Sequence, residues 1–209
     1  KGIIAKWTTG STGYMLFLAS GVVRTYANGT YAAGTTALQA NTWYHIIGTY
    51  DGSNLRVYVN GFLEGTTAAT SLTTDAGALQ LGTYNTRSAS SFNGIIDEPK
   101  VYNYALTADE IKLDYNRGST LVLGSLGDNS SYQKQAANQE YCVPGDSTSC
   151  VTPLAEWKFD EGTSTSAFDS TGNGVKGTLV NSPAWVPGKV GKALNFNGSN
   201  SYVTTTDQD

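Results

Sequence analysis

Short runs of strand-forming residues, each ended by a turn signal, fill residues 2–104 of this 209-residue chain. YMLFLASGVVRTYANGTY (14–31) holds two apolar runs separated by Ser20-Gly21, and Asn28-Gly29 then supplies a dipeptide that strongly favours a tight hairpin. Leu55, Val57 and Val59 alternate with more polar neighbours, which indicates a strand with one buried face. Many strands at such close spacing predict an all-β, antiparallel sandwich.

One short helix is predicted in LTADEIKLDYNRG (106–118). Thr107 stands at the N-cap and Glu110 follows three residues later, the spacing of a capping box. Leu106 and Ile111 occupy the apolar positions of a hydrophobic staple, and Gly118 suits the far end. We therefore expect a helix that packs on an edge of the sandwich.

The charge balance excludes several classes of partner. The formal net charge is −4 and the pI is near 4.9, whereas binding to the phosphates of nucleic acid needs a basic stripe. The same balance disfavours adhesion to anionic lipid. The longest apolar run is far shorter than the roughly 18 residues that cross a bilayer, so no membrane insertion is expected of this sequence.

Residues 118–152 differ in composition from the strands on either side. They are rich in Gly, Ser, Asn and Gln without a sustained period, which is typical of a linker, although TLVLGSL (120–126) could add one short strand. YCVPGDSTSC places Cys142 and Cys150 around a turn-forming loop. We expect a disulfide between them, and hence an extracellular or cell-surface location. Two unpaired thiols or a two-cysteine metal site are the alternatives.

Two groups of motifs resemble the halves of one known module. NTWYHIIGTYDGSNLRVYVNGFLEGT (41–66) and FNGIIDEPKVYNYALTADEI (92–111) resemble the second half of a laminin-G-like module of the concanavalin A-like lectin/glucanase superfamily. AEWKFDEG (155–162), AFDSTGNGVKGTL (167–179) and GKVGKALNFNGSNSYV (188–203) resemble its first half. The resemblance implies a jelly-roll, concanavalin A-like β-sandwich of antiparallel strands with one short helix.

The two halves stand in inverted order along this chain. Residues 1–117 resemble the C-terminal part of a module, residues 118–152 form the linker, and residues 153–209 resemble the N-terminal part. The strand segment that normally joins YVTT to GIIAKW is missing, which we interpret as a segment cut from a tandem array.

An isolated half-module would expose sheet edges and a bare apolar face, both of which are costly. We expect AEWKFD to pair antiparallel beside GIIDEPKVYN, with a neighbouring copy as the preferred partner and closure within one chain as the alternative. Trp157 and Phe159 would then carry the assembly, and head-to-tail contacts between further copies would build a filament.

The loop DSTGNGVKG (169–177) concentrates oxygen ligands. Asp169 and Asn173 offer a carboxylate and an amide beside exposed carbonyls, a set that suits Ca²⁺. In the resembled family this loop often holds structural calcium beside the last strand, which in this chain carries Asp97 and Glu98. The resemblance implies a site of Asp169, Asn173 and either Asp97 or Glu98. A plain Asx turn stabilised by the loop glycines is the alternative.

Catalysis is not expected. Hydrolases of the resembled superfamily carry Glu-x-Asp-x-x-Glu on one strand face, and this motif is absent from the sequence. Asp97 and Glu98 are adjacent on a predicted strand and should point to opposite faces. His45, the single histidine, has no identifiable nucleophile as a partner and is expected to be structural.

Sugar binding is a second hypothesis. Trp7, Tyr26 and Tyr84 could stack on sugar rings, with Arg87 close to Tyr84 in sequence, although aromatic residues of sandwiches more often belong to the core. The leading hypothesis is an extracellular surface or fibre-forming protein that serves adhesion and assembly. A carbohydrate-binding module of a secreted multi-domain protein is the alternative, and a glycoside hydrolase is disfavoured.

Overall fold

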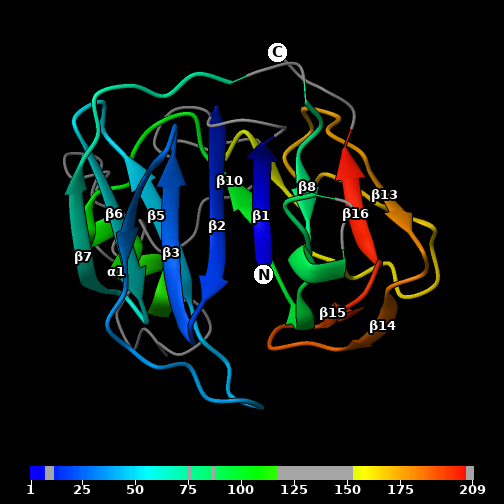
Figure 1. The fold of residues 1–209 in the computed structure, drawn as a ribbon. Coiled ribbons are helices and arrows are strands. Elements are labelled where there is room, and N and C mark those ends of the chain that lie inside the picture. Colours follow the sequence, from blue (N-terminus) through cyan, green and yellow to red (C-terminus); the bar gives the residue numbers. More distant parts are fainter. Residues whose placement is uncertain (8–11, 75–76, 86–87, 117–152, 206–209) are drawn as a thin grey trace, which may run out of the picture.

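The largest sheet has eight strands and draws them from both segments of the sequence. The computed structural model describes residues 1–7, 12–74, 77–85, 88–116 and 153–205. In it the sheet has the strand order β12-β13-β16-β8-β1-β2-β3-β4 (Figure 1). Its strands are β1 (Gly2–Trp7), β2 (Gly13–Ala19), β3 (Val22–Ala27), β4 (Thr30–Ala33), β8 (Gln80–Leu81), β12 (Ser166–Ala167), β13 (Gly177–Val180) and β16 (Tyr202–Thr205).

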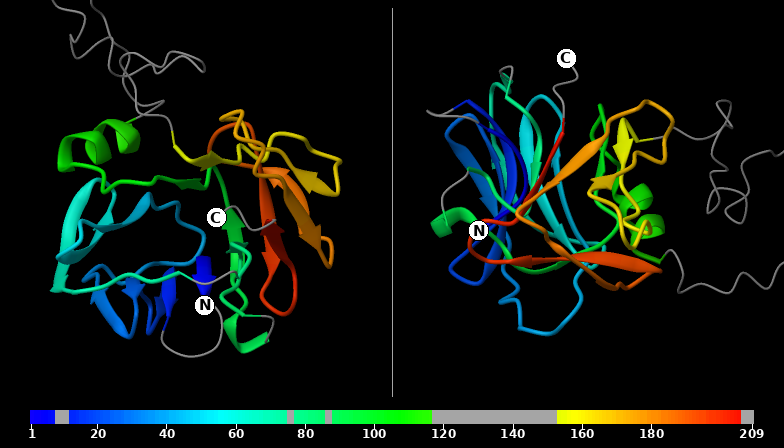
Figure 2. Two further views of the ribbon diagram at one scale, coloured as in Figure 1. Left: turned by 90° about the horizontal axis from the view of Figure 1, so that it is seen from above. Right: turned by 90° about the vertical axis from the view of Figure 1, so that its right-hand side faces the viewer.

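The remaining strands form three smaller sheets. They are β5 (Ile46–Tyr50), β6 (Asn54–Val59) and β7 (Phe62–Ala68); β14 (Ala184–Pro187), β15 (Lys192–Asn197) and β9 (Asn93–Ile96); and β10 (Lys100–Val101) with β11 (Ala155–Glu156). The helical elements are η1 (Ser88–Ser90) and α1 (Ala108–Asn116). Seen from above, β1 to β4 lie along one side of the molecule and β10, β11 and α1 along the other (Figure 2). This is the all-β sandwich with one short helix that the sequence predicts.

The tight turns lie where the sequence predicts them. Asn28 and Gly29 have φ values of 43° and 89° and connect β3 to β4. Ser20 and Gly21, with φ values of 52° and 79°, connect β2 to β3 in the same way. Two successive residues with positive φ match the twist of the flanking strands. Both hairpins are therefore specified by local sequence.

The predicted capping box opens α1. The backbone N–H of Thr107 donates to the Glu110 carboxylate over 2.7 Å, and the Glu110 N–H donates to Thr107 Oγ1 over 3.3 Å. Ile111 is fully buried and anchors the helix on the sandwich. No helix in the described ranges combines the length and the apolar character that crossing a bilayer requires.

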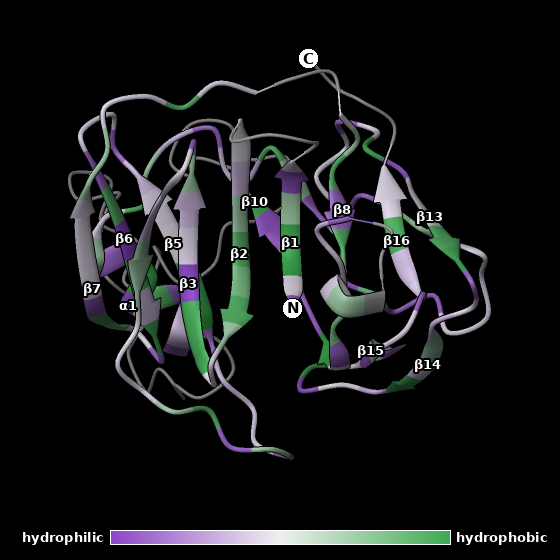
Figure 3. Ribbon diagram, viewed as in Figure 1, coloured by the Kyte–Doolittle hydropathy of each residue, from purple (hydrophilic) through white to green (hydrophobic). Residues whose placement is uncertain are grey.

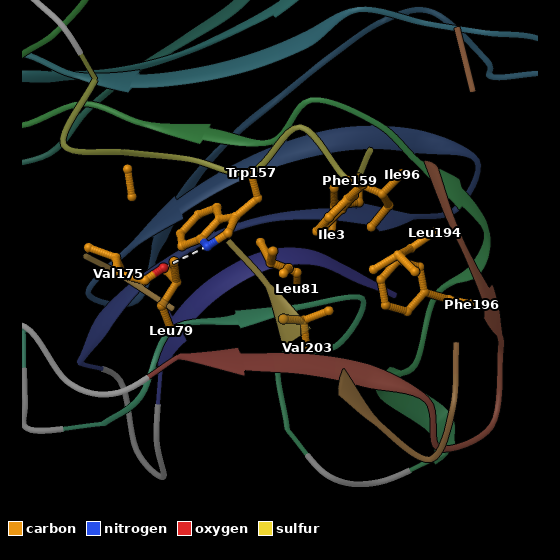
Figure 4. Close-up of a cluster of buried hydrophobic side chains, with 12 residues drawn as sticks. Ile3, Leu79, Leu81, Ile96, Trp157, Phe159, Val175, Leu194, Phe196 and Val203 are labelled. Carbon is orange, nitrogen blue, oxygen red and sulfur yellow. Dashed lines mark hydrogen bonds between the residues drawn. The ribbon is translucent and has the colours of Figure 1, made fainter. Parts of the chain in front are cut away.

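Buried apolar side chains form two clusters. Figure 3 shows apolar stretches on strands of both segments, including β2, β13 and β16. The first cluster combines both segments (Figure 4) and contains Ile3, Leu79, Leu81, Ile96, Ala155, Trp157, Phe159, Ala167, Val175, Leu194, Phe196 and Val203. The second belongs to the first segment alone and contains Val23, Ala27, Ala32, Leu55, Val57, Val59 and Ala69.

Three strand pairings join the two segments. β10 pairs antiparallel with β11 and places Lys100 opposite Glu156, so AEWKFD lies beside GIIDEPKVYN. β9 pairs with β15, and β8 pairs with β16. Leu81 of β8 stands opposite both Ile4 and Val203, so β8 lies between β1 and β16. The pairings described here lie within one chain, and completion by a neighbouring copy stays a prediction.

Candidate functional site

Trp157 and Phe159, the residues that the sequence marks for assembly, lie where the two segments meet. Both side chains are fully buried. The indole N–H of Trp157 donates to the Val175 carbonyl over 2.7 Å, and the ring of Phe159 meets that of Trp185 edge-on at 6.5 Å. In Figure 4 both side chains point into the cluster that also holds Ile3 of β1. Trp157 and Phe159 are therefore part of the apolar contact between the two segments, together with the other buried residues of this cluster.

A charged network crosses the same junction. Nζ of Lys100 on β10 lies 2.7 Å from one carboxylate oxygen of Asp114 on α1 and 3.7 Å from the carboxylate of Glu156 on β11. Nε2 of His45 lies 3.0 Å from the other Asp114 oxygen. The hydroxyl of Ser170 donates to Glu156 over 2.6 Å. The network thus connects α1, β10, β11 and the loop after β12, and it spans both segments.

Burial and charge give two carboxyls of this region opposite pKa shifts. Burial alone would raise the pKa of Asp114, but the hydrogen bond with His45 and the charge of Lys100 outweigh it and hold the pKa well below its usual range. Burial, followed by the negative charge of Glu156, raises the pKa of Glu98 to about 7, although Lys100 opposes the rise. The junction therefore holds one carboxyl firmly ionised and another that titrates near neutral pH.

The predicted calcium loop is organised around Asp169. Its Oδ1 accepts hydrogen bonds from the backbone N–H groups of Glu156 and Thr171 over 3.1 and 3.0 Å. The Thr171 hydroxyl lies 2.8 Å from each Asp169 oxygen. Asn173, in the same loop, donates its side-chain amide to the Leu154 carbonyl over 3.0 Å. Asp169 thus accepts the hydrogen bonds of an Asx turn, so a calcium ion would have to take the place of some of these donors.

The other two predicted calcium ligands make separate contacts. One oxygen of Asp97 accepts the N–H groups of Lys189 and Val190 over 2.7 and 2.9 Å, and the other is buried without a hydrogen-bond partner. Burial raises the pKa of Asp97. Glu98 interacts with the charges of Lys100 and Glu156. Within the ranges that the structure describes, no three His, Cys, Asp or Glu side chains are grouped to hold a metal ion. The calcium site stays a prediction.

Two of the predicted sugar-stacking residues are neighbours. The rings of Trp7 and Tyr84 meet edge-on with centroids 5.7 Å apart, and the ring of Phe17 lies 6.4 Å from that of Tyr84. The indole nitrogen of Trp7 is buried without a hydrogen-bond partner among the described residues. Tyr26 lies on β3, opposite Met15 of β2. Three predicted site residues lie outside the described residues: Arg87, Cys142 and Cys150.

Comparison with known families identifies the module. The family model described as concanavalin A-like lectin/glucanases superfamily, of the laminin-G type, matches residues 1–112. The chain belongs to this superfamily. The matched laminin-G residues carry β1 to β10 and the first turn of α1, so the resemblance stated for the first segment is confirmed.

The chain is also similar to one solved structure. This is a 2.1 Å crystal structure of an S-layer domain-containing protein, residues 221–444, from Clostridium thermocellum ATCC 27405. The two share 22% identity with a TM-score of 0.33, and the alignment covers 55% of this chain and 62% of that one. The chain therefore spans less than two thirds of that structure. A comparison with curated proteins gives no match.

The sequence did not identify the partner of His45 in this laminin-G-type sandwich. His45 contacts Asp114, and its ring lies 5.6 Å from that of Tyr115. Both partners follow the buried Ile111 by three and four residues. This spacing places them on the helix face that is turned toward the sandwich, so it is the signal that could have identified them.

Proposed function

We propose that this chain is a non-catalytic structural module of an extracellular surface or fibre-forming protein, in which laminin-G-type sandwiches are completed by strand pairing. The proposal rests on the strand pairing between the two segments. Residues 153–205 contribute strands to three sheets that also contain strands of residues 1–101. Membership of a lectin-like superfamily and the absence of the Glu-x-Asp-x-x-Glu motif support a role without catalysis.

Exchange of the second segment between copies would join them head to tail. The same pairings and the same apolar contacts would form, so little new contact energy is required. Residues 118–152 can reach about 115 Å when extended, which permits pairing either within or between chains. A head-to-tail contact that does not close on itself builds a filament. We propose this arrangement as the route to a surface fibre.

Light scattering tests the assembly. The full chain should give a mass above its monomer value of 22.1 kDa, and the mass should rise with protein concentration and fall on dilution. Circular dichroism on the same samples reports whether the chain is folded. A folded 22.1 kDa monomer over the whole concentration range would overturn assembly between copies.

The oxidised cysteine pair is part of the extracellular proposal. Cys142 and Cys150 are separated by a short polar loop with turn-forming residues. Thiol titration of the secreted chain, denatured without reductant, should find no free thiol. Two free thiols per chain would contradict both the disulfide and this support for an oxidising compartment.

A carbohydrate-binding role is the second candidate, and the contact between Trp7 and Tyr84 favours it. Aromatic rings can stack on the apolar faces of sugars, and Trp7 and Tyr84 are both half-buried rather than fully enclosed. The indole nitrogen of Trp7 is buried without a hydrogen-bond partner among the described residues. A glycan array should then show binding by the full chain that Trp7→Ala removes. Trp43→Ala, which changes another partly exposed tryptophan, is the matched control. Equal signals from both variants would reject this role.

A further inference from the structure

Lys100, Asp114 and Glu156 form a nearly enclosed cluster where the two segments meet. Their side chains are 10%, 17% and 13% exposed. Nζ of Lys100 lies 2.7 Å from Oδ1 of Asp114, which is a hydrogen-bonding distance, and 3.7 Å from Oε1 of Glu156. Taking ammonium and carboxylate charges out of water is costly, and their mutual attraction offsets this cost only in part. A reaction that removes two of these charges would also remove part of that cost.

A second Lys–Asp pair on the same helix lacks this environment. Nζ of Lys112 lies 3.8 Å from Oδ1 of Asp109, and the two side chains are 59% and 92% exposed. Water solvates both charges there, and exposed pairs of this kind hold their two groups together only weakly. The Lys112–Asp109 pair therefore provides an internal comparison for the chemistry of Lys100.

Two further groups are placed to act on the Lys100–Asp114 pair. Nε2 of His45 lies 3.0 Å from Oδ2 of Asp114, the oxygen that does not face Lys100. A hydrogen bond to this oxygen stabilises the negative charge that develops there when a nucleophile attacks the carboxyl carbon. Oε1 of Glu156 faces the ammonium group, while its Oε2 accepts the Ser170 hydroxyl over 2.6 Å. Glu156 is thus held in a position to receive a proton from Lys100.

An amine, a carboxyl group, a proton acceptor and a hydrogen-bond donor are the groups that amide formation needs. Glu156 takes one proton from the Lys100 ammonium, and the resulting amine attacks Cγ of Asp114. The new C–N bond replaces the bond from Cγ to Oδ1. Oδ1 leaves as water with two protons that came from the ammonium group and passed through Glu156. One ammonium and one carboxylate thus become one neutral amide and one water, so atoms and charges balance without a further reactant.

The ionised form of Asp114 is the less reactive one, because a carboxylate repels nucleophiles. Burial raises the pKa of Asp114, and the hydrogen bond with His45 and the charge of Lys100 lower it. Once Lys100 has given up its proton, the effect of its charge is lost and burial favours the neutral carboxyl group. Loss of that proton therefore makes the amine and the carboxyl group reactive together.

We propose that Lys100 and Asp114 become joined by an amide bond between their side chains after the protein has folded. β10 and α1 hold the two groups in contact, and well-oriented groups can react as if they were present at about 10⁵–10⁸ M. The contacts and charges described above are those of the state before this bond forms. The proposal is a covalent modification, so it goes beyond the structural role proposed above.

The reacting site is complete only when the two segments have paired. Lys100 and Asp114 belong to the first segment, whereas Glu156 stands opposite Lys100 on β11 of the second. The first segment by itself would hold the pair without this proton acceptor. The bond should therefore form after β10 and β11 have paired, whether the second segment comes from the same chain or from a neighbouring copy.

Mass spectrometry of the full chain, denatured and reduced after folding, tests the proposal. We expect a mass that is lower than that of the sequence by one water molecule. Chymotrypsin can cut after Tyr102 and Tyr104, which lie between the two residues in sequence. The peptides that contain Lys100 and Asp114 should nevertheless stay joined. A parent chain with the full sequence mass would show that the pair remains ionic and would overturn the proposal.

A succinimide at Asp51-Gly52 would lose the same mass, so the two products must be distinguished. Hydroxylamine destroys a succinimide, whereas an amide between side chains survives it. Loss of water that hydroxylamine abolishes would therefore overturn the proposal. Joined peptides that survive hydroxylamine support it, and this result comes from the parent chain even where a variant fails to fold.

Lys100→Arg keeps the positive charge but removes the primary amine, so this variant should have its full sequence mass. Lys112→Arg, on the exposed pair, is the matched control and should still lose one water. Glu156→Gln removes the proton acceptor. When the mass is followed during cell-free synthesis, this variant should lose water more slowly than the parent by about a hundredfold or more. Loss of water that persists in Lys100→Arg, or an unchanged rate in Glu156→Gln, would contradict the assigned groups.

Discussion

Lys100 connects the charged groups where the two segments meet, because it contacts carboxylates of both segments. Its side chain is only 10% exposed, and its ammonium group lies 2.7 Å from the carboxylate of Asp114 and 3.7 Å from that of Glu156. Asp114 also bonds with His45, so the three groups hold α1 against β10 and the start of β5. A buried charge that loses its partner is strongly destabilising, whereas an exposed pair contributes little. The environment of each pair therefore decides its effect on stability.

Replacing Lys100 should destabilise the fold. Lys100→Met removes the ammonium group that lies 2.7 Å from the carboxylate of Asp114, whose side chain is 17% exposed, and we expect the free energy of unfolding to fall by about 2–3 kcal/mol. Lys112→Met breaks an exposed pair with Asp109 on the same helix and should change it by less than about 0.5 kcal/mol. Urea denaturation measures both. If both variants lost the same free energy of unfolding, the buried Lys100–Asp114 pair would not matter more to stability than the exposed Lys112–Asp109 pair.

Glu98 should make stability fall as pH rises. Its folded pKa is about 7 and its ordinary value is 4.5, so between these values the unfolded state has lost a proton that the folded state keeps. Stability then decreases as pH rises through this window. Glu98→Gln should flatten the decline in melting temperature between pH 4.5 and 7, with little effect below it. Parallel declines in the two proteins would show that other groups cause the dependence.

Individual elements follow the sequence closely where their signals are local. The Asn28-Gly29 turn is predictable because positive φ is a preference of those two residues, and the Thr107–Glu110 box acts within one helical turn. The contact of His45 with Asp114 spans 69 residues, and the bond of Asp97 to the amide of Val190 spans 93. Such contacts are set by the packing of the two layers, which sequence periodicity does not specify.

The loop 169–175 remains the element to test for calcium. Asp169 accepts bonds from its own loop, and the calcium prediction requires the ion to replace some of them. If it does, saturating Ca²⁺ at about 100 times its Kd should add about 2.7 kcal/mol to the free energy of unfolding, and a chelator should remove this gain. Asp169→Asn should remove the response. A melting temperature that is insensitive to both calcium and chelator would leave the Asx turn as the whole explanation.

The whole molecule depends on contact between segments that are distant in sequence. The first core cluster takes Ile3 and Leu81 from one segment and Trp157, Phe159 and Val203 from the other. The inverted order and the pairing of AEWKFD with GIIDEPKVYN could be anticipated only through resemblance to a known module.

A charge at Trp157 should separate the two segments. Trp157→Asp would bury an unpaired carboxylate and remove the donor to the Val175 carbonyl. We expect the free energy of unfolding to fall by about 4 kcal/mol or more, which is comparable with the stability of a whole domain. Trp43→Asp, at a site that is 41% exposed, should stay within about 0.5 kcal/mol. Circular dichroism in urea measures both. A Trp157→Asp variant that unfolds at the same urea concentration as the parent would contradict the burial.

A disulfide cross-link tests most directly whether the two segments form one sandwich. Ile95 of β9 stands opposite Asn195 of β15, and both side chains are exposed. Opposite residues of an antiparallel pair have Cα atoms about 4.5–5.5 Å apart, which suits a disulfide. In a Cys142→Ser, Cys150→Ser background, Ile95→Cys with Asn195→Cys should cross-link under mild oxidation, and a non-reducing gel would show whether the bond lies within or between chains. Two thiols that stay free in the folded protein would contradict the pairing of the segments.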